Sequence, residues 1–182
     1  MQLGVSLDIL TWLSFLESSG VRLGFATLLL AVALVITSSP ASQAQQSMSK
    51  FEADPEIQKI AEAYALDMID YAKQTYGIDL DWSDGSVQQV ERIAALLHDE
   101  YEKAPPTSEQ IAPFYRALGS YIGEVFRRNH GAEWGWVTLE GDRFPGMQHR
   151  PSSLFWPWGK AMNRIVNGPE DNLWHYYQVL LR

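Results

Sequence analysis

Three stretches of the chain place apolar residues three and four positions apart, which is the spacing of an amphipathic helix. They cover residues 54–77, 83–104 and 107–131. Each stretch opens on a residue type that caps helix N-termini, namely Asp54 (followed by Pro55), Ser83 or Ser86, and Thr107. Each closes at a glycine or proline, namely Gly77, Pro105 and Gly131. The sequence therefore predicts three consecutive helices, each with one buried face.

The pattern changes after residue 131. Residues 134–139 alternate in the period of two that is typical of a strand. Residues 146–150 and 153–156 are expected to return as one or two short strands, and Pro145 limits their length. Two further helices are predicted to open at Pro157 and Pro169. The expected fold class is α+β, mainly helical, with three N-terminal helices, a small antiparallel sheet of two or three strands, and two C-terminal helices.

An apolar segment near the N-terminus has the layout of a signal peptide. Residues 23–36 are almost all apolar, Arg22 precedes them, and the small side chains of Ser42 and Ala44 favour cleavage after Ala44. A membrane-spanning helix needs roughly 20 apolar residues, and this run is shorter. We therefore expect a cleaved signal peptide and a periplasmic or secreted protein, with an uncleaved membrane anchor as the alternative.

Cleavage at this position divides the chain into three parts. Residues 1–44 are the signal peptide, residues 45–50 are a polar and flexible tether, and residues 51–182 form a single globular domain. Residues 1–20 contain two acidic residues and neither lysine nor arginine, which is unusual for a signal peptide. Val21 is therefore an alternative initiator, in which case residues 1–20 are not translated.

Composition narrows the range of partners. The 182 residues carry a formal net charge of −8, which repels nucleic acid and anionic lipid, so we expect no nucleic acid and contact with a membrane only through an uncleaved signal segment. Residues 51–110 hold 14 acidic and 4 basic side chains, whereas residues 111–182 hold 6 and 8. The complete lack of cysteine excludes disulfides and thiolate chemistry. A basic or neutral protein is the expected partner.

Catalytic spacings are not found in the sequence. His98, His130, His149 and His175 do not form an HExxH motif or any other pair four residues apart. A nucleophile elbow and a phosphate-binding glycine loop are also missing. The sequence therefore assigns no catalytic residue, no metal ligand and no cofactor, and Glu124 with a histidine is the acid–base pair that an enzymatic alternative would use.

The segment with the most unusual local pattern is residues 118–128. Gly119 and Gly123 lie four residues apart in a predicted helix, where each glycine costs about 1 kcal/mol relative to alanine. We expect another element to pack closely against them. Glu124 precedes Arg127 and Arg128 at the spacing of an intrahelical ion pair. The favoured interpretation is a tight helix crossing with this ion pair at its rim, and the functional alternative makes Glu124 a buried acceptor for backbone amides or for a ligand.

Tryptophans gather in the C-terminal part of the chain. Trp134, Trp136, Trp156 and Trp158 follow the third predicted helix within 28 residues of its end. Aromatic residues dominate cores and interfaces alike. These four residues are therefore either the filling between a thin sheet and its helices or a candidate binding surface for a protein or a sugar.

Several short motifs together resemble a known group of domains. Tyr121, Gly123 and Glu124 form a Tyr-x-Gly-Glu motif, and Gly131 with Trp134 forms a Gly-x-x-Trp motif. In this order the motifs resemble small bacterial domains of unknown function, in which a helix with the first motif precedes a strand with the second. Some domains of similar pattern accompany toxin systems as immunity-type proteins. The resemblance covers roughly residues 80–180 and implies an α+β fold and an interaction role.

The observations favour an exported binding or immunity-type protein that acts through protein–protein interaction rather than an enzyme. Two alternatives remain. One is a cell-envelope hydrolase that uses Glu124 with a histidine, and the other is a structural component of the envelope with no ligand of its own.

Overall fold

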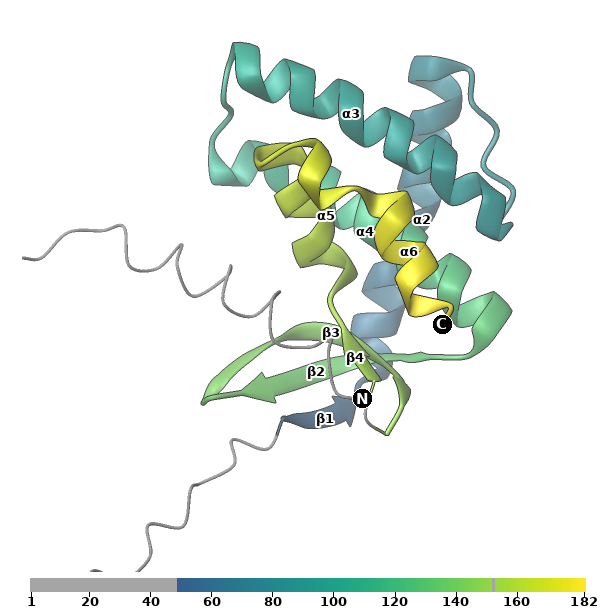
Figure 1. Cartoon of the computed structure of the whole chain (residues 1–182), viewed down its shortest axis with the longest axis vertical. Helices are drawn as coiled ribbons and strands as arrows, with labels where there is room; N and C mark the ends of the chain where they lie inside the picture. Colours follow the sequence, from purple (N-terminus) through teal and green to yellow (C-terminus); the bar gives the residue numbers. More distant parts are fainter. Residues whose placement is uncertain (1–48, 152) are drawn as a thin grey trace, which may run out of the picture. The chain divides into compact units, whose positions relative to one another are not determined.

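The computed structural model of the chain describes residues 49–151 and 153–182. They belong to one compact unit, Gln45–Arg182. The expected signal peptide, its cleavage site and the tether up to residue 48 lie outside the described residues. These described residues form five helices and a small sheet, whose arrangement is shown in Figure 1.

The elements follow one another in the order strand, three helices, three strands and two helices. Their bounds are β1 (Lys50–Ala53), α2 (Pro55–Tyr76), the 3-10 turn η1 (Asp84–Ser86), α3 (Val87–Lys103), α4 (Ser108–His130), β2 (Glu133–Leu139), β3 (Asp142–Arg150), β4 (Ser153–Phe155), α5 (Pro157–Val166), the 3-10 turn η2 (Pro169–Asp171) and α6 (Leu173–Leu180). The α+β class predicted from the sequence is confirmed.

Local signals explain where the long helices begin and end. The Asp54 carboxylate accepts a hydrogen bond from the Glu56 amide at 2.8 Å, which caps α2. Thr107 and Gln110 form a reciprocal capping box at the start of α4. Gly77 ends α2 in the left-handed conformation, with φ at 67°, a region that glycine adopts without steric cost.

The sheet differs from the prediction in two of its strands. It has four antiparallel strands in the order β1-β2-β3-β4, rather than two or three. The additional strand is β1, so the three helices do not open the domain, and Lys50, which we assigned to the tether, is its first residue. β3 also runs through Pro145. A proline is tolerated there because β4 pairs with β3 only from Met147 onward, so no strand lies beside Pro145 on the side away from β2.

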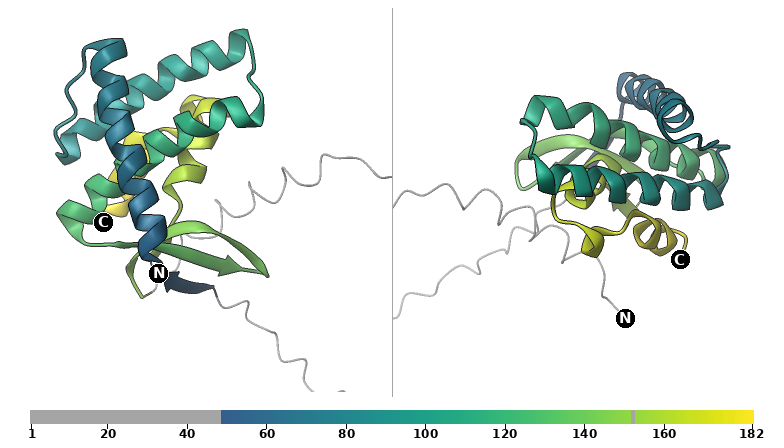
Figure 2. Two further views of the ribbon diagram at one scale, coloured as in Figure 1. Left: turned by 180° about the vertical axis from the view of Figure 1, so that it is seen from behind. Right: turned by 90° about the horizontal axis from the view of Figure 1, so that it is seen from above.

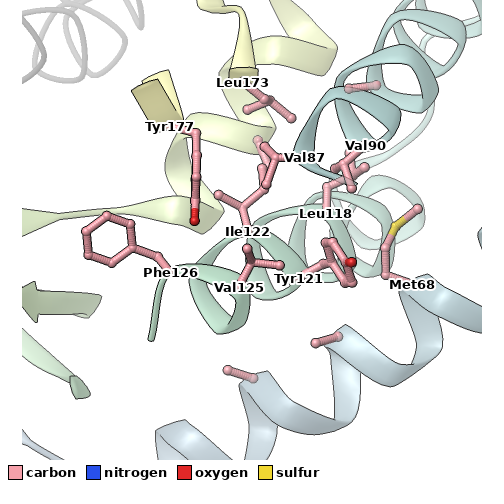
Figure 3. Packing of buried hydrophobic residues seen from close by; sticks show 14 of the residues in the cluster. Met68, Val87, Val90, Leu118, Tyr121, Ile122, Val125, Phe126, Leu173 and Tyr177 are labelled. Carbon is pink, nitrogen blue, oxygen red and sulfur yellow. The ribbon is translucent and has the colours of Figure 1, made fainter. Parts of the chain in front are cut away.

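The helices lie on one side of the sheet (Figures 1 and 2). The side chains of Trp134, Met147 and Phe155 point to this side and belong to the hydrophobic core. α4 lies between α2 and α5 and contributes an uninterrupted run of buried residues from Leu118 to Phe126. Figure 3 shows this run of α4 packed among side chains of α2, α3 and α6. α4 is therefore the central helix of the domain.

Two glycines of α4 permit close packing in the core. A Cβ atom at Gly119 would lie 2.5 Å from the carbonyl oxygen of Pro157 and 2.8 Å from Trp158 Cα, at the start of α5. A Cβ atom at Gly123 would overlap the Trp134 ring and lie 2.8 Å from Met147 Sδ. The close approach expected from the spacing of these glycines is present, with a helix at one and the sheet at the other.

Replacement of Gly119 by alanine is expected to lower the free energy of unfolding by about 1–3 kcal/mol, because the new methyl group meets backbone atoms that cannot move without shifting α5. Urea denaturation measures the change. Gly159→Ala is the matched control, since that glycine is also helical and its added Cβ would meet its nearest neighbour, Trp156 Cβ, at 3.9 Å. Equal effects of the two substitutions would contradict the assignment of Gly119 to a tight crossing.

Candidate functional site

Glu124 is a fully buried carboxylate on α4, and its side chain has 0% exposure. Arg127 donates to both of its oxygens, from Nε to Oε1 and from Nη2 to Oε2, each at 2.9 Å. The indole Nε1 of Trp134 donates to Oε1 at 2.9 Å, and Arg128 Nε donates to Oε2 at 3.3 Å. The protein thus supplies four hydrogen bonds to this one carboxylate.

The two arginines extend these contacts to neighbouring elements. Arg127 Nη2 also donates to Glu62 of α2 at 3.1 Å, and these ion pairs raise the pKa of Arg127, chiefly through the hydrogen bond to Glu124. The Arg128 guanidinium lies 3.6 Å from the centre of the Trp82 ring, a cation–π contact. Glu124 therefore connects α4 with β2, α2 and the loop before α3.

This geometry suits a structural carboxylate better than an acid–base catalyst. A general acid or base must reach a substrate proton within hydrogen-bond distance. Both oxygens of Glu124 are occupied by side chains of the protein, and none of these donors is a histidine. The ion pair that we expected at this spacing is present. Its carboxylate is buried, whereas the side chains of Arg127 and Arg128 are 25% and 36% exposed.

Trp82 is held in a strained backbone conformation beside this centre. Its φ of 65° lies in the left-handed region, which is uncommon for a residue with a large side chain. Its amide donates to the Tyr121 hydroxyl at 2.9 Å, and its carbonyl accepts from Asn129 Nδ2 at 3.0 Å. Its ring stacks on Tyr121 with centroids 5.0 Å apart, and Arg128 covers the ring as well. Contacts from α4 therefore fix this residue in place.

Asp84 collects a second group of polar side chains at the C-terminal end of α4. Its Oδ1 accepts from the Tyr177 hydroxyl at 2.6 Å and from Asn129 Nδ2 at 2.9 Å, and His130 Nε2 lies 3.0 Å from both carboxylate oxygens. Partial burial raises the pKa of Asp84, but these hydrogen bonds outweigh it, so the pKa lies below its ordinary value. Sequence reasoning missed Asp84, because its partners lie 45 to 93 residues away.

The four tryptophans chosen from the sequence do not form one surface. Trp134 is 1% exposed and is a core residue, because Gly123 leaves room for its ring. The indole of Trp136 donates to Asp54 at 2.8 Å, and that of Trp158 donates to Ser120 at 2.7 Å. Trp156 is partly buried, and its Nε1 is buried without a partner in the described part of the chain. Three of the indoles are thus anchored within the domain.

None of the four histidines donates a hydrogen bond to Glu124. His98 and His149 contact backbone carbonyl oxygens, of Ile165 and Gly131 respectively, and His130 contacts Asp84. Among residues 49–151 and 153–182, no group of three or more histidine, aspartate or glutamate side chains is arranged to hold a metal ion. Within the same residues, no helix combines the length and the apolar character needed to cross a bilayer.

The side of α2 that points away from the core exposes apolar residues next to acidic ones. Ile60 is 44% exposed and Leu66 is 56% exposed. Ala63, Asp67 and Asp70 are also exposed and, at 100° per residue, fall on the same third of the helix surface as the first two. We refer to these five residues as the outer α2 face.

Removal of the Glu124 charge is expected to be costly. In the Glu124→Gln variant, Arg127 and Arg128 lose their buried counter-charge, and the free energy of unfolding should fall by about 3 kcal/mol, the lower end for a broken buried pair because both guanidinium groups still reach water. Thermal or urea unfolding measures this. The matched control is Glu62→Gln, which removes a partly exposed partner of the same arginine and should cost about 0–1 kcal/mol. A loss for Glu124→Gln no larger than for the control would refute the structural role.

Comparison with known proteins gives a likeness of fold. No protein-family model and no curated protein sequence matches the chain. Among solved structures, the domain resembles a protein from Bacteroides thetaiotaomicron VPI-5482, with a TM-score of 0.55 and 12% sequence identity over 79% of this chain. The matched region is 51% of that protein, so the chain spans about half of its length. At this identity the likeness shows the α+β fold alone.

Proposed function

We propose that this protein is an exported binding protein of the immunity type, which acts by docking a basic protein on the outer α2 face. The proposal rests on one observation. The outer α2 face combines exposed apolar side chains with acidic side chains that are not neutralised within the domain.

The apolar part of this face would lose water on binding. Ile60 and Leu66 are two of the six exposed large apolar side chains among the described residues. The exposed Ala63 lies between them on the helix surface. Burial of apolar surface is the main favourable term in protein association. A partner that covers this stripe gains affinity from it.

The acidic part selects the charge of the partner. The two lysines of α2 are already paired, Lys59 with Glu56 at 2.7 Å and Lys73 with Asp79 at 2.6 Å. Asp67 and Asp70 have no such partner in the part of the chain that the structure describes. Complementary charge speeds encounter and excludes partners of the same sign. The formal charge of −8 acts in the same direction.

The two alternative functions receive less support from the geometry. A hydrolase based on Glu124 would have to displace four hydrogen bonds before the carboxylate could reach a substrate. A purely structural envelope component gives no reason for an exposed apolar stripe beside unpaired acidic residues. Export stays part of the proposal through the apolar run at residues 23–36 and the small side chains before Gln45.

Site-specific photo-crosslinking tests the proposed docking face. A photo-reactive amino acid is placed at position 63, in the middle of the outer α2 face, or at position 88, where Gln88 is exposed on α3. The purified proteins are illuminated in periplasmic extract of the source bacterium, and crosslinked products are identified by mass spectrometry. We expect one basic protein at position 63 and no crosslink to it at position 88.

Charge reversal then tests the chemistry of the contact. Asp67→Lys with Asp70→Lys should lower the crosslinking yield at position 63 by at least about tenfold, because like charges would face each other. The control is Asp99→Lys with Glu102→Lys, which makes the same charge change at two exposed residues of α3 and should leave the yield unchanged. A crosslinked partner that is acidic, or a yield that responds equally to both pairs of substitutions, would rule out the proposed docking face.

A further inference from the structure

The free edge of the sheet is a short strand, and its register shows which of its backbone groups bond to the neighbouring strand. β1 is the edge strand, and it pairs with β2 with Phe51 opposite Val137 and Glu52 opposite Trp136. The amide of Asp54 donates to the carbonyl of Trp134 at 3.0 Å. In an antiparallel pair, hydrogen-bonded positions alternate along the strand. Even-numbered residues of β1 therefore bond to β2, and odd-numbered residues direct their amide and carbonyl groups to the open edge.

The open edge is available for a further strand. Phe51 and Ala53 direct their backbone groups away from β2. Ser49, just before the strand, is expected by the same alternation to do so as well. Among the described residues, no other strand lies beside β1 on this side (Figure 1). Unpaired edges of this kind accept another chain unless they are covered or made repulsive.

The side chains of β1 make it complementary to itself. If two copies of β1 run antiparallel with Phe51 opposite Phe51, then Lys50 of each copy lies opposite Glu52 of the other. Opposite charges across a strand pair stabilise it, and so do paired aromatic side chains. The Phe51 rings share the face of the sheet away from the helices, and the charged residues share the other face.

The neighbouring registers are less favourable. Only shifts of two residues keep the odd-numbered residues in hydrogen-bonded positions. A shift one way sets Lys50 opposite Asp54, whose carboxylate already accepts hydrogen bonds from Glu56 and Trp136, but places Glu52 opposite Glu52 of the second copy. A shift the other way places Lys50 opposite Lys50. Both set like charges against each other, which destabilises a strand pair. Glu52 is free to take a new partner, because its present contact with Arg143 is exposed and 3.8 Å long.

We propose that β1 pairs with β1 of a second copy of this chain about a two-fold axis, in the register that sets Phe51 against Phe51. The pairing joins two four-stranded sheets into one of eight strands. It is an isologous contact, so it closes on itself as a dimer and does not propagate. The edge is only about five residues long, so the area that it buries is well below the roughly 1,200 Å² of a standard interface. The dimer is therefore transient and depends on concentration.

Sedimentation velocity over a range of concentrations tests this proposal on the exported chain. The wild type is expected to dimerise more strongly at low salt. Lys50→Glu and Glu52→Lys should each weaken dimerisation by about tenfold, since each creates two like-charge contacts per dimer. An equimolar mixture of the two variants should form a heterodimer of wild-type affinity, because the opposite charges then face each other again.

The backbone contact has its own matched pair of variants. Ala53→Pro removes an amide that faces the open edge while leaving the bonds to β2 in place, and it should abolish dimerisation. Ala53→Val keeps that amide and should dimerise as the wild type does. Circular dichroism confirms that each variant is folded.

Three outcomes would overturn the proposal. They are a wild type that stays monomeric at millimolar concentration and low salt, a mixture of Lys50→Glu and Glu52→Lys chains that fails to recover association, and dimerisation that persists in Ala53→Pro. The last result would place the contact on another surface. The β1 edge is distinct from the outer α2 face, so failure here leaves the proposed docking face untouched.

Discussion

The buried carboxylate of Glu124 needs charged partners and hydrogen-bond donors, and residues from α4 and the sheet supply them. A charge removed from water must be paired and hydrogen-bonded, or it destabilises the fold. Arg127 and Arg128 supply the charge from the same helix, and Trp134 supplies a further donor from the sheet. Trp134 reaches the carboxylate because Gly123 has no side chain in its path. The glycine, the carboxylate and the tryptophan thus form one unit that fixes α4 against β2.

Polar groups available to a partner lie on two surfaces of the domain, because the carboxylates of Glu124 and Asp84 are already hydrogen-bonded within it. Glu124 is saturated by internal donors, and Asp84 is likewise occupied by Tyr177, Asn129 and His130. On the surface of the described residues, groups without a partner lie at the outer α2 face and along the open edge of β1. A dimer through β1 would present two outer α2 faces on one particle. A partner with two matching sites would then bind more tightly than one site allows, through a raised effective concentration.

The sequence predicted features that depend on nearby residues. The caps at Asp54 and Thr107 are local, and so is the three- and four-residue spacing that pairs Glu124 with the arginines. Features that join distant segments were missed. The four residues of β1 are too few to show a strand period, and their partners on β2 lie more than 80 residues away. Asp84 was missed because its partners lie 45 to 93 residues away. The indole of Trp134 lies only ten residues from Glu124 in the sequence, but their contact depends on how the sheet meets α4.

Hydrogen exchange at the indole Nε1 of Trp134 tests the central claim most directly, namely that Glu124 and Trp134 form a buried contact on which the native packing depends. An amide or indole that opens only when the whole domain unfolds exchanges with a free energy equal to that of global unfolding. The structure predicts this limit for Trp134, measured by NMR and compared with the free energy from urea denaturation. Exchange at a free energy well below the global value would show that the contact opens locally, and would contradict the central place given to Glu124.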